Sequence, residues 1–142
     1  MSINFEKICN NLSLGNIIEN AEKINGGITN QMYKIQTTKG KFAVKIINKH
    51  RIQKNKNILK NIEFSEQIAT IANLNNINSI PAIRFNNKYV QNIGDEYILV
   101  YKWCDGKILL TKEIDIEKVK IIANMLAKLH KIVPKSDIKS EK

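Results

Sequence analysis

Polar and apolar residues alternate along residues 31–47, which predicts a hairpin of two strands, because successive side chains of a strand point to opposite faces. Lys39-Gly40 interrupts the alternation and supplies the turn. Residues 96–103 form an almost continuous apolar run, which is typical of a central strand covered on both faces. Weaker strand patterns occur at 16–24 and, as a short hairpin, at 82–91.

Two other segments have the spacing of amphipathic helices. In residues 56–74 most apolar side chains fall on one half of a helix that turns about 100° per residue. In residues 116–130 they form one stripe, with Asp115 as a candidate N-cap and Pro134 just beyond the end. We therefore expect an α+β fold, in which a mostly antiparallel sheet carries one helix laid across it.

Length and composition are those of an ordinary globular domain. The 142 residues fit one domain, or one domain and a piece of another. No apolar run approaches the roughly 20 residues that span a bilayer, and residues 1–15 lack the pattern of a secretory signal. Cys9 and Cys104 form no metal-binding pattern, and we interpret them as free thiols in a reducing compartment. These features predict a cytoplasmic protein without a membrane partner.

The net charge of +10 raises the question of nucleic-acid binding. Nearly all of the excess is lysine in a chain rich in Asn and Ile, and Arg51 and Arg84 are its two arginines. The lysine cluster at 48–60 has no interleaved aromatic residues, which a base-stacking surface would need. We therefore expect no nucleic-acid partner, and a basic nucleic-acid-binding domain remains a second alternative.

Lys45 places one cation inside the apolar run of residues 42–47. One explanation is an edge position from which the amine reaches water. The other is that the lysine holds a phosphate. A cation in a low-dielectric site is costly unless it is paired, so the second explanation requires a carboxylate, and Glu63 and Glu66 both follow on the next helix.

Three stretches carry a family resemblance. They are GGITNQMYKIQTTKGKFAVKI at 26–46, YILVYKWCDGKIL at 97–109 and IIANMLAKLHKI at 121–132. In this order they resemble the aminoglycoside phosphotransferase and choline kinase superfamily, and the GGITN form is similar to bacterial choline kinases. The resemblance implies a protein-kinase-like small lobe, with an antiparallel sheet of about five strands plus one helix. Residues 1–103 would be this ATP-binding lobe, and residues 104–142 the interdomain linker and the first helix of a truncated large lobe.

The resemblance also implies site residues. Lys45 would orient the α- and β-phosphates of ATP and pair with a glutamate of the following helix. On the helical wheel Glu66 borders the apolar face, whereas Glu63 lies roughly opposite it and would point to water. We therefore expect Glu66 to be the partner, with Glu63 as the alternative.

Further positions would surround the nucleotide. The loop over the phosphates would contain Gly26, Gly27, Thr29 and Asn30, since glycines let backbone amides approach an anion closely. At the adenine base, the resemblance implies the Lys102 carbonyl and the Cys104 amide as contacts, with Tyr101 at the back of the pocket. The alternative for the glycine loop is an ordinary hairpin turn, for which Asn-Gly is a common signal. For Trp103 the simpler role is packing.

The sequence contains no H-x-D-x-x-x-x-N segment, which kinases of this type need for catalysis. We therefore expect no catalytic and no metal-binding residue in this chain, which alone would be inactive. Mg²⁺ and the acceptor, an alcohol such as choline, ethanolamine or an aminoglycoside, would bind with the missing lobe. The first alternative is a non-catalytic nucleotide-binding or protein-interaction module. The kinase interpretation predicts an exposed apolar face on 116–130, which is also a surface for oligomerisation.

Overall fold

The computed structural model describes residues 3–24, 29–106 and 109–132. Its elements, in chain order, are α1 (Phe5–Asn11), β1 (Glu22–Ile24), β2 (Gln31–Thr37), β3 (Gly40–Ile46), α2 (Lys49–Lys54), α3 (Ile58–Leu74), β4 (Gln91–Ile93), β5 (Glu96–Lys102), the short 3-10 helix η1 (Thr111–Glu113) and α4 (Ile116–His130). The predicted loop glycines, Gly26 and Gly27, and Pro134 after the last predicted helix lie outside the described residues.

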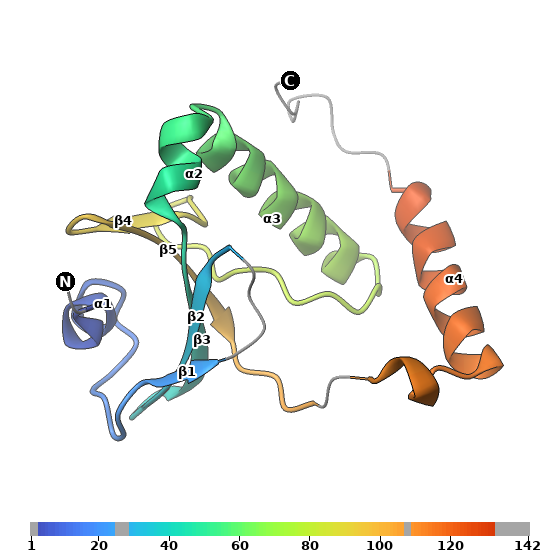
Figure 1. Cartoon of the computed structure of the whole chain (residues 1–142), viewed down its shortest axis with the longest axis horizontal. Helices are drawn as coiled ribbons and strands as arrows, with labels where there is room; N and C mark the ends of the chain where they lie inside the picture. Colours follow the sequence, from blue (N-terminus) through green and yellow to red (C-terminus); the bar gives the residue numbers. More distant parts are fainter. Residues whose placement is uncertain (1–2, 25–28, 107–108, 133–142) are drawn as a thin grey trace.

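The strands form one antiparallel sheet in the order β1-β2-β3-β5-β4 (Figure 1). The predicted hairpin at 31–47 is β2 and β3, with Thr37 opposite Gly40 at its turn. The predicted central strand is β5, which lies between β3 and β4. The α+β class and the five-stranded antiparallel sheet are therefore confirmed, and the kinase-like assignment stays a prediction.

The sheet buries a core on each face. On one face Val44 and Val100 pack in a cluster with Ile8 of α1. On the other face Leu99 belongs to a cluster against which Leu59 and Ile62 of α3 pack. Residues 44 and 45, or 99 and 100, contribute to opposite faces because side chains alternate along a strand. The two helices thus cover opposite sides of the sheet (Figure 1).

The pattern of polar and apolar residues does not predict two of the helices, α1 and α2. The seven residues of α1 are too few for a clear periodicity, but Asn4 caps the helix and Ile8 and Cys9 are buried. The predicted hairpin at 82–91 is reduced to a bridge between Phe85 and Lys88. Asn86 and Asn87 form its turn with φ of 47° and 65°, which is left-handed backbone that asparagine tolerates.

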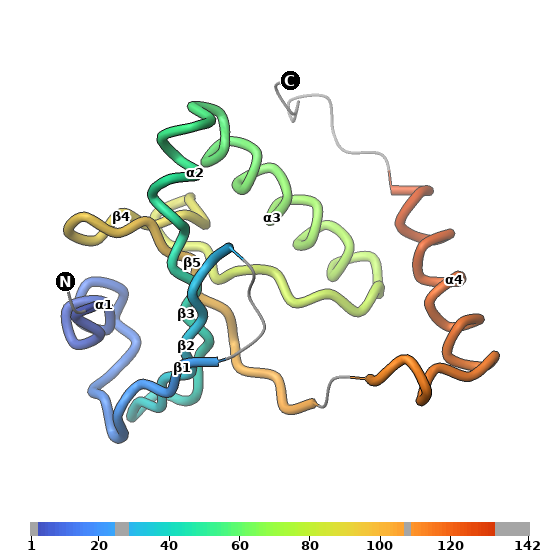
Figure 2. Tube along the Cα trace, viewed as in Figure 1, coloured from blue at the N-terminus to red at the C-terminus, as the bar shows by residue number. Residues whose placement is uncertain are grey.

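Helix α4 lies on the far side of α3 from the sheet (Figures 1 and 2). Asp115 caps it as predicted, since its side chain accepts from the Lys118 amide. The predicted exposed apolar face is confirmed: Ile116, Val119, Ile122 and Leu126 are each about half exposed. Within the described ranges, no helix is both long enough and apolar enough to cross a membrane.

Candidate functional site

Lys45 lies on the face of the sheet that α3 covers. It stands on β3, opposite Met32 of β2 and Leu99 of β5, and directly opposed residues share a face. Leu99 belongs to the core beneath α3. Lys45 is therefore on an inner strand and half-buried, which does not fit the interpretation that it sits at an edge of the sheet.

Glu66 reaches this same face from α3. Its Oε1 accepts a hydrogen bond of 2.8 Å from the Tyr101 hydroxyl, and its Oε2 accepts one of 2.8 Å from the Ala82 amide. Tyr101 lies opposite Ala43, two residues from Lys45 along β3. The carboxylate is thus tied to the strand next to the one that carries Lys45, and the expectation that Glu66 turns toward the sheet agrees with these contacts.

The amine of Lys45 makes no hydrogen bond and no ion pair within the described part of the chain. Glu66 can still receive it, because a carboxylate has about four lone-pair sites and two are used. The predicted Lys45–Glu66 pair therefore stays a prediction. The arrangement leaves a half-buried cation on β3 and an anchored carboxylate that reaches the same face of the sheet from α3.

The pKa of the Tyr101 phenol is shifted by these surroundings. Burial raises its pKa well above the ordinary value of about 10, and the hydrogen bond and negative charge of Glu66 raise it further. The phenol therefore remains a neutral donor at physiological pH. Because this donor is neutral, it holds Glu66 in place and leaves the negative charge of the carboxylate available to a cation.

Glu63 does not point to water, and that prediction is wrong. One of its carboxylate oxygens accepts from the Tyr89 amide at 3.0 Å and from the Val90 amide at 2.7 Å. The helical wheel misses this role because segment 79–90 packs back along α3, which only the tertiary fold decides. Glu63 thus anchors that segment, and its bonds are to backbone amides rather than to Lys45.

Thr29 and Asn30, which follow the glycine pair, contact the start of α2. The Asn30 Oδ1 accepts from the Asn48 amide at 3.1 Å, and the Thr29 Oγ1 accepts from Arg51 Nη1 at 3.4 Å. A threonine hydroxyl that accepts one bond can still donate its own proton. Arg51 was not among the predicted site residues, because nothing in the local sequence indicates that α2 folds back onto Thr29.

The end of β5 carries the residues predicted near adenine. Because the Trp103 amide bonds to the Lys41 carbonyl, the backbone groups of Lys102 point away from β3 by the alternation of an antiparallel ladder. Cys104 is exposed. The Trp103 indole donates to Asp105 Oδ1 at 2.8 Å, and the Lys34 amine lies 5.0 Å from the ring centroid. Trp103 is therefore more than a packing residue.

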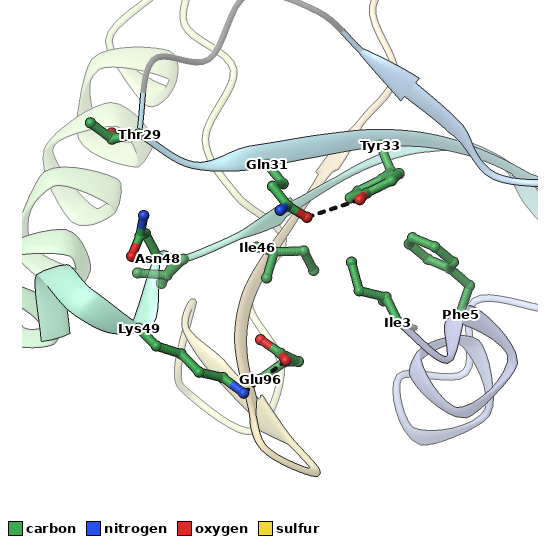
Figure 3. Close-up of a pocket in the computed structure, with 10 residues that line it drawn as sticks. Ile3, Phe5, Thr29, Gln31, Tyr33, Ile46, Asn48, Lys49 and Glu96 are labelled. Atoms are coloured by element: carbon green, nitrogen blue, oxygen red, sulfur yellow. Dashed lines mark hydrogen bonds and ion pairs between the residues drawn. The ribbon is translucent and has the colours of Figure 1, made fainter. Parts of the chain in front are cut away.

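A groove lies on the opposite face of β2 and β3 (Figure 3). It has a volume of about 680 Å³ and is lined by Ile3, Phe5 and Ile46 and by a polar rim that includes Thr29. The charged groups of the rim bond to each other, since Lys49 pairs with Glu96 at 2.9 Å, and the Tyr33 hydroxyl donates to Gln31 at 2.9 Å. The Lys45 face is the stronger candidate because its cation has no such partner.

No protein-family model matches this chain, and a search of curated proteins finds no match. Among the described residues, no three His, Cys, Asp or Glu side chains gather in a group that could hold a metal ion. The candidate site therefore rests on the residues themselves: Lys45, Glu66, Tyr101, Thr29 and the end of β5.

Proposed function

We propose that this chain binds ATP as the small lobe of a small-molecule phosphotransferase of the choline kinase or aminoglycoside phosphotransferase type. The observation that carries the proposal is the position of Lys45. It is a half-buried lysine on an inner strand, on the face covered by α3, and Tyr101 of the neighbouring strand anchors the Glu66 carboxylate on that same face. A cation in such surroundings is stabilised by an anionic ligand.

Different residues would contact different parts of the nucleotide. Lys45 would contact the α- and β-phosphates, and Glu66 would orient its amine. The Thr29 hydroxyl would donate to a phosphate oxygen, and the Asn30 side chain holds the adjoining backbone through Asn48. At the other end, the Lys102 carbonyl and the Cys104 amide would contact adenine, with Tyr101 behind them.

Kinases of this type transfer the phosphoryl group with an aspartate of an H-x-D-x-x-x-x-N segment and with Mg²⁺, and the sequence contains no such segment. We therefore assign the described residues to binding and orientation of ATP. The half-exposed apolar face of α4 fits a helix that is covered by further protein, which in this proposal is a large lobe with the acceptor pocket. Cytoplasmic ATP would then be the natural substrate.

Calorimetric titration of the chain with ATP tests the proposal. Lys45→Ala is expected to weaken binding about tenfold or more, because charge-assisted bonds to phosphate are among the stronger ones. Lys41→Ala is the matched control, because Lys41 is an exposed lysine of the same strand and face, roughly 13 Å away at 3.3 Å per residue. It removes the same charge and should leave the affinity for ATP unchanged.

Two outcomes would contradict the proposal. If the folded wild-type chain does not bind ATP, the proposed function fails. If both lysine variants weaken binding equally, the attraction is the general effect of a net charge of +10. In that case, binding to any DNA duplex that falls steeply with salt would favour the nucleic-acid alternative.

A further inference from the structure

Arg51 lies beside the residues that follow the glycine pair. It belongs to α2, and its Nη1 is 3.4 Å from the Thr29 Oγ1. Ile52, the next residue, packs against the core beneath α3. Helix α2 therefore contributes to the core on the same side of the sheet as Lys45, and its Arg51 contacts Thr29, which also lines the groove of the other face.

The start of α2 is held in this position by a second contact. The Asn48 amide donates to the Asn30 side chain at 3.1 Å, while the Asn48 side chain accepts from the His50 amide at 2.9 Å. The positions of Thr29 and Arg51 are thus coupled through Asn30 and Asn48. The Arg51 guanidinium is therefore held close to the backbone of residues 29–30 by two contacts.

The charge of Arg51 is not neutralised within the described residues. Lys49 of the same helix pairs with Glu96, but Arg51 contacts a hydroxyl and no described carboxylate. A guanidinium presents a rigid fork of donors that matches phosphate oxygens. A half-buried arginine whose only described side-chain partner is a neutral hydroxyl has donors to spare for an anion.

Arg51 and Lys45 both lie near the point where β2 begins: Arg51 contacts Thr29, two residues before this strand, and Lys45 pairs with Met32, its second residue. Thr29 precedes Met32, the residue opposite Lys45, by three positions, or roughly 10 Å of extended chain. A polyphosphate chain offers separate phosphates to two cations that lie near the same end of a strand pair. We propose that Arg51 is a second phosphate-binding residue, which contacts the end of the phosphate chain and makes the site select ATP over AMP.

This proposal rests on the proposed function, and nucleotide selectivity tests it separately. ATP and AMP are titrated calorimetrically into the wild-type chain, Arg51→Gln and Arg51→Lys. Arg51→Gln should bind ATP about tenfold more weakly and AMP as the wild type does. Arg51→Lys keeps the charge but not the forked donors of arginine, so its affinity for ATP should lie between those of Arg51→Gln and the wild type. Lys54→Gln is the control, since it removes an exposed cation from the same helix, and it should match the wild type.

The outcomes separate the two proposals. If the wild-type chain binds neither nucleotide, both proposals fail. If the wild type binds ATP but Arg51→Gln behaves as Lys54→Gln does, the role of Arg51 is overturned and that of Lys45 stands. If Arg51→Gln weakens ATP and AMP binding equally, Arg51 supports the fold of the site and does not select the phosphate chain. Circular dichroism of each variant shows whether it is folded.

Discussion

The Tyr101 hydroxyl donates a 2.8 Å hydrogen bond to Glu66 Oε1 and thereby joins β5 to α3. The other oxygen of the same carboxylate binds the Ala82 amide. One glutamate therefore ties together a helix, a strand and the segment between them. The residue that the proposed function uses to orient Lys45 is also a structural anchor, so its substitution would mix two effects. Predictions about stability are cleaner at its neighbours.

Replacing Tyr101 with Phe should lower the free energy of unfolding by about 1–2 kcal/mol, because a part-buried carboxylate loses one of its donors. Urea unfolding followed by circular dichroism measures the change. Tyr97→Phe is the matched control: Tyr97 lies on the same strand and packs in the same cluster, without a hydroxyl partner among the described residues. Equal losses in the two variants would show that the Tyr101–Glu66 bond adds nothing to stability.

Stability at alkaline pH should also depend on Tyr101. Its folded pKa is raised above the unfolded value of about 10, so above that pH the unfolded state releases a proton that the folded state keeps. The stabilising contribution is complete below about pH 10 and is lost as the pH rises through the folded pKa.

The measurement is urea unfolding at a series of pH values from about 8 to 11. The wild type should lose more stability over the upper part of this range than Tyr101→Phe, in which the group is absent. All other ionisable groups are the same in the two proteins, so their contributions cancel in the comparison. Parallel curves would mean that Tyr101 ionises as readily in the folded chain as in the unfolded one.

Glu63→Gln should destabilise the chain by about 1–3 kcal/mol, since the two backbone amides that share one carboxylate oxygen would lose a charged acceptor and keep only a neutral amide oxygen. Thermal or urea unfolding measures the loss. Glu117→Gln is the control, because Glu117 is exposed on α4, and it should change stability little. If Glu63→Gln matched this control, segment 79–90 would be held by apolar packing alone.

The local pattern of polar and apolar residues was sufficient to predict the elements in which that pattern is long and regular. The hairpin of β2 and β3, the continuous apolar run of β5 and the spacing of α3 and α4 each follow from side-chain periodicity over seven or more residues. Helix α1 could not be predicted in this way. It is short, and its helical state depends on burying Ile8 and Cys9 against the far face of the sheet.

The candidate site divides in the same manner. The sequence by itself determined that one lysine stands inside an apolar strand, that two glutamates follow on a helix, and that glycines precede Thr29. Only the tertiary structure decided that Glu66 bonds to Tyr101, that Glu63 holds the backbone of 89–90, and that Arg51 meets Thr29. These contacts join residues 22 to 35 positions apart. No local periodicity encodes such pairs, because they form only when separate elements pack on the same face of the sheet.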